Sequence, residues 1–305
     1  MNESGIQSCV LGIDAGGTRT RARLADAATG AVLGEGVGGA GNALSVASGE
    51  LVRNLVRALR GAVPGGRAGA VVSVVAGFAG GGPGGGVEKA GSALAAALSG
   101  VGAAPARVEV VGDADIAFAS GPGVPADGLV LIAGTGAAAA RVERRRAVRA
   151  ADGDGWLLGD AGSGFWLGRE ALRAVLRSLD GRGPATSLAG AVGEVCGGLT
   201  KEAVVGYGFT GHPVRLAALS PLVVEAERTG DEVAGALLDR AADELAATVG
   251  ALAPRPGEPL VVTGGLLGPG GPLLPRFAER VGAAGLVPSP VPDGLAGAVA
   301  LARLP

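Results

Sequence analysis

The chain has 305 residues, of which 48% are hydrophobic, and its formal net charge is −2. This length is enough for one large or two ordinary domains, and no apolar run approaches the roughly 20 residues that a transmembrane helix needs. With two Trp, one Tyr, five Phe and no long basic run, the composition argues against a nucleic-acid partner, because bases are bound by basic patches and aromatic rings.

The first half of the sequence predicts the element order β-β-β-α-β-α-β. Apolar runs bounded by turn residues mark the strands, and apolar residues at helical spacing mark the helices. The expected strands are 9–14, 20–26, 31–37, 68–77 and 107–115, and the expected helices are 42–63 and 87–98. In the first of these helices, Leu44, Leu51, Leu55 and Leu59 share one face. The glycine-rich stretch 79–89 is expected to form a flexible surface loop.

The second half repeats this plan. Strands are expected within 128–142, at 145–150, at 259–268 and near Leu286, and helices at 162–181, between 187 and 253 and at 294–304. The helix at 162–181 carries an apolar stripe of Leu167, Ala171, Leu172, Val175, Leu176 and Leu179. A strand, a Gly-Thr turn and a second strand occur at 11–24 and again at 129–142. This repetition predicts two similar α/β domains with a ligand-binding cleft between them.

The two Gly-Thr turns are candidates for phosphate binding. A tight turn rich in glycine can direct several backbone N–H groups at one anion, and the threonine hydroxyl adds a donor. Asp14 precedes the first turn and would need Mg²⁺ or its water between it and a phosphate. The dinucleotide fingerprint is excluded, because a strand follows "GIDAGGT" where that fingerprint has a helix. The only lysines are Lys89 and Lys201, so a Walker phosphate loop is excluded as well.

Two strand-end carboxylates have both a structural and a functional interpretation. Asp113 follows the strand "VEVV", where it could cap a helix or orient an attacking hydroxyl; Asp115 ranks second for the functional role. Asp160 could cap the helix that begins near Ser163. Together with the amide of Asn42, it could instead hydrogen-bond a polyhydroxylated substrate.

The remaining features favour ordinary structural roles. Cys9 and Cys196 lie far apart in sequence and are expected to be buried thiols. His212 cannot form a metal cluster alone and is expected at the surface. The triplet Arg144–Arg146 is expected to be an exposed hairpin turn. The polar stretch "MNESGIQS" at 1–8 lacks a signal-peptide core, so a cytoplasmic location is expected.

Five motifs in order carry a resemblance to a known family. They are "DAGGT" at 14–18, "GDAD" at 112–115, "IAGTG" at 132–136, "GDAGSGFWLG" at 159–168 and "VTGGLL" at 262–267. Together they resemble the BadF/BadG/BcrA/BcrD-type ATPases, the branch of the actin–hexokinase–Hsp70 superfamily that includes N-acetylglucosamine kinase. The resemblance implies an α/β fold of duplicated ribonuclease H-like (actin-like ATPase) domains with an interdomain cleft. The expected domains are 1–117 and 118–294, with a C-terminal helix at about 295–305 packing back on the first.

The resemblance also implies an activity and a set of site residues. It implies an ATP:sugar phosphotransferase that uses ATP and Mg²⁺ on N-acetylglucosamine or a related amino sugar, at its 6-hydroxyl. Its partner would be a small-molecule sugar, without nucleic acid or membrane, and a homodimer is common in the family. The implied ATP-binding residues are Asp14 (with Mg²⁺ through water), Gly16, Gly17, Thr18, Gly134, Thr135, Gly136, Gly264 and Gly265. The implied sugar-binding residues are Asn42, Asp113, Gly155 and Asp160, with Asp113 also accepting the proton of the attacking hydroxyl. Trp156 or Trp166 could supply an apolar sugar face, or belong to the core.

The sequence departs from the family pattern at three places. Ala137 follows the second turn where Ser is usual, Ala161 stands where Glu is usual, and "DGDGW" at 152–156 replaces Gly-Gly-Trp-Gly. These departures leave the sugar open and keep a catalytically silent sugar- or ATP-binding regulator as an alternative. An ATPase activator of a 2-hydroxyacyl-CoA dehydratase is less favoured, because no cysteine lies near the second turn to hold an iron–sulfur cluster. Repressor branches are disfavoured, since no helix-turn-helix precedes residue 9 and a Cys-rich zinc motif is absent.

Overall fold

The computed structural model describes residues 7–81 and 86–305, which form two compact units. Unit 1 comprises Met1–Val130, Val142–Val148 and Val291–Pro305, and unit 2 comprises Leu131–Arg141 and Arg149–Pro290. The expected surface loop at 79–89 and the polar N-terminal stretch lie partly outside the described residues. The domain boundaries expected from the sequence stay predictions.

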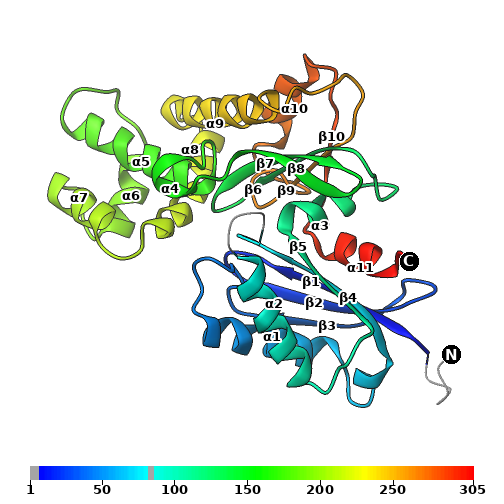
Figure 1. The fold of residues 1–305 in the computed structure, drawn as a ribbon. Coiled ribbons are helices and arrows are strands. Elements are labelled where there is room, and N and C mark those ends of the chain that lie inside the picture. The colour runs from blue at the N-terminus through cyan, green and yellow to red at the C-terminus, as the bar shows by residue number, and fades with distance from the viewer. Residues whose placement is uncertain (1–6, 82–85) are drawn as a thin grey trace. The chain divides into compact units, whose positions relative to one another are not determined.

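Two five-stranded sheets with one shared strand order form the framework (Figure 1). The first has the order β3-β2-β1-β4-β5, and the second, read from its far edge, has the equivalent order β8-β7-β6-β9-β10. The strands of the first sheet are β1 (Cys9–Ala15), β2 (Thr20–Asp26), β3 (Val32–Gly38), β4 (Val71–Phe78) and β5 (Arg107–Gly112). Those of the second are β6 (Gly128–Ala133), β7 (Ala137–Glu143), β8 (Arg146–Asp152), β9 (Leu260–Thr263) and β10 (Pro288–Pro290). The predicted duplication of mixed α/β sheets is confirmed.

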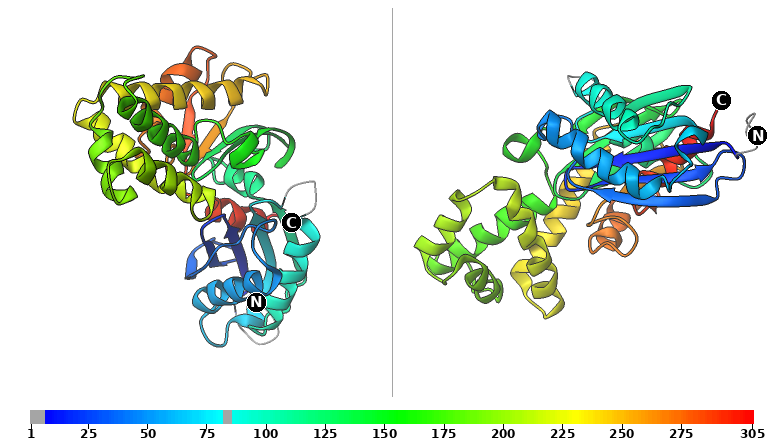
Figure 2. Two further views of the ribbon diagram at one scale, coloured as in Figure 1. Left: turned by 90° about the vertical axis from the view of Figure 1, so that its left-hand side faces the viewer. Right: turned by 90° about the horizontal axis from the view of Figure 1, so that it is seen from below.

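Helices cover both faces of the first sheet (Figures 1 and 2). One core contains alternate residues of β1, such as Leu11 and Ile13, together with α1 (Ser48–Ala62) and α2 (Val87–Ser99). The opposite core contains Val10, α3 (Asp113–Ala119) and α11 (Leu295–Arg303). Since side chains alternate along a strand, Asp14 lies on the same face as Val10. The alternation therefore directs the Asp14 carboxylate toward α11.

Close packing fixes α11 against β1 and α3. A Cβ on Gly12 of β1 would lie 2.7 Å from the Val299 backbone nitrogen, and one on Gly297 would lie 2.0 Å from the Ile116 carbonyl oxygen. The Gly297 N–H also donates to Ser120 Oγ at 2.8 Å. These contacts bring the end of the chain against its first strand.

The helix expected at 42–63 begins later than predicted. α1 starts at Ser48, and Leu44 is 65% exposed instead of lying on the buried face. The cause is local, because Asn42 Oδ1 accepts hydrogen bonds from the N–H groups of Leu44 and Ser45 at 2.9 and 3.0 Å. A turn stabilised by an asparagine side chain competes with helix formation in this way.

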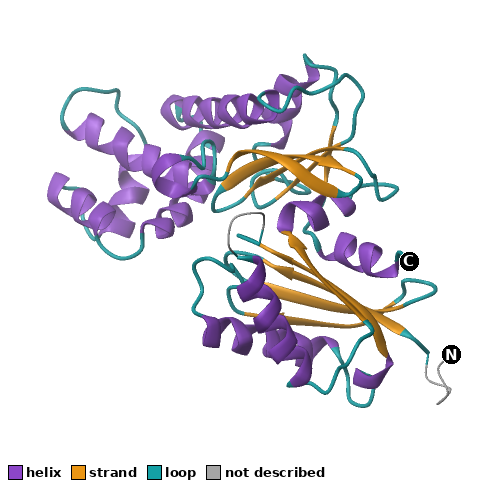
Figure 3. Ribbon diagram, viewed as in Figure 1, coloured by secondary structure: helices purple, strands orange, loops and turns teal. Residues whose placement is uncertain are grey.

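Unit 2 is largely helical between its strands (Figure 3). Its helices are α4 (Gly155–Leu158), α5 (Gly164–Leu179), α6 (Leu188–Cys196), α7 (Lys201–Phe209), a 3₁₀ helix (Pro213–Leu219), α8 (Ser220–Arg228), α9 (Glu232–Gly250) and α10 (Leu274–Gly282). The predicted stripe on α5 is buried at Leu167, Ala171, Leu172 and Val175, whereas Leu179 is 41% exposed. The stripe therefore ends before the last turn of the helix.

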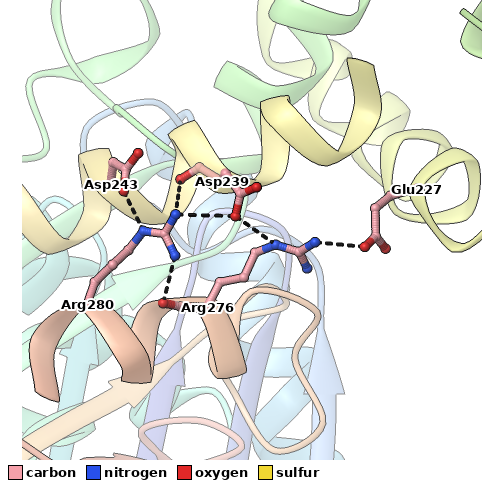
Figure 4. A network of polar contacts seen from close by, with 5 residues as sticks. All are labelled: Glu227, Asp239, Asp243, Arg276 and Arg280. Carbon is pink, nitrogen blue, oxygen red and sulfur yellow. Dashed lines mark hydrogen bonds and ion pairs between the residues drawn. The ribbon is translucent and has the colours of Figure 1, made fainter. Parts of the chain in front are cut away.

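Ion pairs connect α8, α9 and α10 (Figure 4). Arg276 of α10 bonds Glu227 of α8 at 2.7 Å and Asp239 of α9 at 3.2 Å, and Arg280 pairs with Asp239 and Asp243. The aspartates are more than half exposed, so solvent screens these pairs. The network fixes the direction of α10 along α9 more than it adds stability.

The smaller sequence predictions have mixed outcomes. Cys9 is buried as expected, but Cys196 is partly exposed because it ends α6. His212 is exposed, and its Nδ1 accepts from the Val214 N–H at 3.3 Å. Arg144 and Arg145 form the expected turn between β7 and β8, but only Arg144 is exposed, and Arg146 is the half-buried first residue of β8. Within the described ranges, no helix is both long and apolar enough to cross a bilayer.

Candidate functional site

The first glycine–threonine turn connects β1 to β2 in unit 1. The Gly16 N–H donates to the Arg19 carbonyl at 3.0 Å, and the Gly16 carbonyl accepts from the Gly41 N–H at 2.9 Å. In a trans peptide the next N–H points opposite to this carbonyl, so the Gly17 N–H is directed away from Gly41. Gly17 and Thr18 are exposed, and neither N–H donates a hydrogen bond to another of the residues that the structure describes. This turn can therefore offer two successive donors to an anion.

The second turn connects β6 to β7 in unit 2 and has the same property. The Gly134 N–H donates to the Gly136 carbonyl at 2.9 Å. The first N–H groups of α5, those of Gly164 and Phe165, donate to the carbonyls of Gly134 and Thr135 at 2.8 and 3.0 Å. Because these two carbonyls face α5, the N–H groups of Thr135 and Gly136 point away from it. Each unit thus presents one nest of two backbone donors.

Gly264 and Gly265 follow β9 and have different environments. Gly264 has φ +97°, and a Cβ there would lie 2.2 Å from the Ala133 carbonyl oxygen. That oxygen accepts from the Leu266 N–H at 3.1 Å, so the turn is fixed against the end of β6, immediately before Gly134. Gly265 is exposed and its Cβ would meet nothing within 4 Å. Backbone packing requires glycine at 264, whereas 265 has room beside it for a ligand.

Asp113 is the first residue of α3 and is half-buried. Burial, together with the nearby charge of Asp14, raises the pKa of Asp113 to about 7. Its Oδ1 accepts a hydrogen bond from the next N–H, that of Ala114, at 3.0 Å. The N-cap of α3 is Gly112, so the capping role considered for Asp113 is wrong. A carboxylate with a pKa near neutrality suits proton transfer.

Asp115 has a structural role instead. Its Oδ1 accepts from the Ala147 N–H at 2.6 Å, and its Oδ2 accepts from the Gly112 N–H at 3.2 Å. It is 6% exposed, and burial raises its pKa. Both oxygens are occupied by backbone donors, so Asp115 fixes the start of α3 beneath Asp113.

Asp14 is held by the segment that precedes α11. Its Oδ2 accepts from the Gly294 N–H at 3.1 Å, and Arg21 lies 3.9 Å from the same oxygen while pairing with Asp293 at 3.0 Å. Burial raises the pKa of Asp14, and the charge of Asp293 acts in the same direction. Arg21 lies opposite Asp14 in the β1–β2 hairpin, whereas Asp293 reaches Arg21 only because the segment before α11 returns from the far end of the chain. Neither residue was predicted from the sequence.

The Asp14 region can hold a hydrated cation but not a fully protein-bound one. In the described residues no group of three or more His, Cys, Asp or Glu side chains could bind a metal ion. Mg²⁺ commonly uses one or two carboxylates together with water and substrate phosphates. The charges of Asp14 and Asp113 repel each other. A cation bound near these two carboxylates would relieve that repulsion.

Asp160 lies beside the second turn in unit 2. Its Oδ1 accepts from the Ala137 N–H at 3.0 Å, and a Cβ on Gly136 would lie 2.6 Å from that oxygen. Burial raises the pKa of Asp160. Ser163, whose Oγ accepts from the Trp166 N–H, is the N-cap of α5, so the capping role considered for Asp160 is wrong.

Asn42 and Gly155 are placed near their respective turns. Asn42 is half-buried and follows Gly41, which bonds the first turn; its Oδ1 is occupied by the N–H groups of Leu44 and Ser45. Its side-chain NH₂ is therefore the group that could reach a ligand. Gly155 begins α4 with φ +82°, in the loop that ends at Asp160.

The tryptophans have separate roles. Trp166 is 5% exposed and belongs to the core, whereas Trp156 is 36% exposed. The Trp156 ring contacts the Phe165 ring edge-on at 5.9 Å. Of the two, Trp156 is the one available to a ligand.

The structure thus brings the predicted residues together in two groups. Unit 1 holds Asp14, Gly16–Thr18, Asn42 and Asp113, and unit 2 holds Gly134–Gly136, Gly155, Asp160, Gly264 and Gly265. Each group combines one nest of backbone donors with at least one carboxylate whose pKa is raised.

Two kinases of known assignment match about half of the chain. The chain is 32% identical over 178 residues to the N-acetyl-D-glucosamine kinase of Dictyostelium discoideum, with 55% of this chain and 56% of that protein matched. It is 33% identical over 150 residues to the N-acetylmuramic acid/N-acetylglucosamine kinase of Clostridium acetobutylicum, with 48% of each matched. The matches therefore span about half the length of these relatives.

A solved structure from Chromobacterium violaceum, provisionally assigned as an N-acetylglucosamine kinase, is similar over nearly the whole chain. It has 28% identity and a TM-score of 0.75, and the comparison covers 97% of this chain and 99% of that one. The model of the BadF/BadG/BcrA/BcrD ATPase family matches residues 11–277. With that match extending over most of its length, the chain belongs to the BadF/BadG/BcrA/BcrD ATPase family.

Proposed function

We propose that the protein is an ATP-dependent sugar kinase that transfers the γ-phosphoryl group to a hydroxyl of N-acetylglucosamine or a closely related amino sugar. The observation that carries this proposal is the position of Asp113, a half-buried carboxylate at the start of α3 and at the end of β5, where burial and the charge of Asp14 raise its pKa to about 7. The similarity to sugar kinases named for N-acetylglucosamine supports the substrate class.

Asp113 would be the catalytic residue. Phosphoryl transfer needs the attacking hydroxyl to be oriented and its proton accepted. A carboxylate whose pKa lies near 7 is largely ionised at slightly alkaline pH yet basic enough to take that proton. Asp115 supports this role by fixing the first turn of α3 with hydrogen bonds to Ala147 and Gly112.

The glycine–threonine turns would bind the phosphates of ATP. Gly17 and Thr18 in unit 1, and Thr135 and Gly136 in unit 2, supply backbone N–H groups, which bind phosphate oxygens independently of side-chain charge. Asp14 would hold Mg²⁺ through water, and the cation would neutralise phosphate charge when bound. Gly265, with open space at its Cα, would lie against the adenosine.

The sugar would be recognised by short polar groups. Asn42 offers a side-chain NH₂ donor, and the second carboxylate oxygen of Asp160 can accept from a sugar hydroxyl while Oδ1 keeps its bond to the Ala137 N–H. The backbone N–H or carbonyl of Gly155 would form a further hydrogen bond with the sugar. Trp156 is exposed enough to supply an apolar surface to the sugar ring.

A coupled assay for ADP release tests the proposal. The protein is incubated with ATP, Mg²⁺ and a panel of aldoses that includes N-acetylglucosamine, N-acetylmuramic acid, N-acetylmannosamine and glucose. We expect release that depends on an amino sugar and is lost on chelation with EDTA. Asp113→Asn should lower kcat by about 10²- to 10⁴-fold. Sugar-independent release, or an Asp113→Asn variant as active as the parent, would refute the assignment.

A further inference from the structure

The loop from Gly153 to Ala161 is organised by one carboxylate that sequence analysis did not identify. Asp152 Oδ1 accepts from the N–H groups of Gly153 and Asp160, both at 2.7 Å, and Oδ2 accepts from the Ala161 N–H at 2.8 Å. The carboxylate therefore receives three backbone hydrogen bonds that close the two ends of the loop. Bonds to a charged acceptor are about twice as strong as neutral ones.

The loop has an unusual backbone that the Asp152 carboxylate stabilises. Asp152 and Asp160 have φ of +61° and +57°, although neither is glycine. Such a conformation is unfavourable for a residue with a side chain and persists only where surrounding contacts hold it. At Gly159, a Cβ would lie 2.3 Å from Asp152 Oδ1, so the loop closes directly on the carboxylate.

The closed end of this loop contacts the second glycine–threonine turn. The Asp160 main-chain N–H is held by Asp152, and its side-chain Oδ1 accepts from the Ala137 N–H at 3.0 Å. The same oxygen lies where a Cβ on Gly136 would be 2.6 Å away. A continuous set of hydrogen bonds thus leads from Asp152 through Asp160 to the residue that follows the turn.

We propose that Asp152 is a positioning residue that couples the loop carrying Gly155 and Asp160 to the turn Gly134–Gly136. Through Asp160 it would hold a sugar-contacting carboxylate and a phosphate-binding turn in one fixed arrangement. This inference rests on the proposed function for its kinetic consequences, but not for its structural ones. The rest of the loop offers no substitute, because the nearest carboxylate, Asp154, is exposed and none of the hydrogen bonds described above goes to it.

The first test uses Trp156 as a reporter and needs no catalysis. Trp156 lies inside the loop and is 36% exposed, whereas the other tryptophan, Trp166, is 5% exposed. Acrylamide quenching of fluorescence therefore reports mainly on Trp156. We expect Asp152→Ala to increase the quenching constant and to speed exchange of the Asp160 and Ala161 amide hydrogens. Asp154→Ala, the same replacement at an exposed carboxylate of the loop, should alter neither.

The second test is kinetic. Asp152→Ala should raise the KM of both the sugar and ATP by roughly 10- to 100-fold, since displacement of binding groups by about 1 Å costs up to about 10². Asp152→Asn keeps one acceptor oxygen and tolerates positive φ, so it should recover part of the loss. It also guards against the possibility that the alanine variant fails to fold.

A double-mutant cycle with Asp160→Asn separates positioning from general destabilisation. If Asp152 acts through Asp160, the effect of Asp152→Ala on the sugar KM should shrink in the Asp160→Asn background. Unchanged Trp156 quenching and amide exchange in a folded Asp152→Ala protein, or fully additive effects on KM, would overturn the proposal. Absence of any sugar-dependent activity in the parent would refute the proposed function alone, since the quenching and exchange tests would still decide the role of Asp152.

Discussion

Replacing Asp113 by asparagine should lower kcat by about 10²- to 10⁴-fold and, at neutral and alkaline pH, stabilise the protein. Both effects have one cause, which is the cost of ionising a carboxyl group that is half-buried beside Asp14. The amide fills nearly the same volume but carries no charge. A residue retained for stability alone would show the opposite result, since its replacement would lower stability.

The size of the stabilisation follows from proton linkage. The pKa of Asp113 is about 7 in the folded protein, against an ordinary value of 3.8, so the folded chain binds this proton more tightly than the unfolded chain. Stability that depends on the proton is fully present below pH 3.8 and is lost as the pH rises through 7. A difference of this size corresponds to about 4 kcal/mol at pH 8, and partial solvent contact reduces the expected value to about 2–4 kcal/mol.

Denaturant unfolding at pH 4 and pH 8 measures this effect. The free energy of unfolding of Asp113→Asn minus that of the parent should be small at pH 4 and positive at pH 8. In the parent, kcat/KM should fall about tenfold per pH unit below about 7, because only the ionised carboxylate accepts a proton. Asp115→Asn is the matched control in the same helical turn: it loses charged acceptors for Ala147 and Gly112 and should destabilise the protein by about 1–3 kcal/mol. A loss of stability in Asp113→Asn at pH 8 would refute the reasoning.

Three further predictions concern other residues. Gly264→Ala should lower the free energy of unfolding by at least about 2 kcal/mol, because φ is +97° and the new Cβ would lie 2.2 Å from the Ala133 carbonyl oxygen. At Gly265 a Cβ would meet no atom within 4 Å, so Gly265→Ala should keep the melting temperature but weaken ATP binding in calorimetry. Gly136→Ala should raise the KM of ATP by about tenfold or more, since its Cβ would displace Asp160 Oδ1. Burial acts to raise the pKa of Glu258, but hydrogen bonds from Arg141 lower it overall. The ionised Glu258 therefore stabilises the folded protein above pH 4.5, and this stabilisation is lost as the pH falls through the lower pKa of the folded state. Glu258→Gln should therefore destabilise the protein at pH 7, but little at pH 3, in denaturant titrations.

The fold was predictable because strand periodicity and turn chemistry act locally. The hairpin of β1 and β2 and the later hairpin of β6 and β7 follow from apolar strands joined by Gly-Thr turns, and their repetition indicated the duplication. The start of α1 was missed because the Asn42 side chain forms a turn that stops the helix from extending to Leu44. Helical spacing at Leu44 does not reveal a competing side-chain hydrogen bond.

The candidate site was predictable only where a motif is contiguous. Asp14, Asp113 and Asp160 lie in recognisable segments, but their neighbours do not. Arg21 lies opposite Asp14 through the register of the β1–β2 hairpin, but Asp293 reaches Arg21 only after α11 packs on β1. Asp152 bonds residues eight and nine positions further along. A sequence shows which residues are acidic, whereas the fold determines which backbone donors reach them.

The departures from the family pattern at Ala137 and Ala161 have a common structural explanation. Both alanines contact the loop carboxylates through their backbone N–H groups. The Ala137 N–H donates to Asp160 Oδ1 at 3.0 Å, and the Ala161 N–H donates to Asp152 Oδ2 at 2.8 Å. Every residue except proline supplies this donor, so alanine preserves both bonds. The absence of a hydroxyl at 137 or a carboxylate at 161 therefore leaves the hydrogen bonds between Asp152, Asp160 and the second turn intact. The arrangement of Asp152, Asp160 and the second turn therefore does not depend on the side chains that the family pattern has at these two positions.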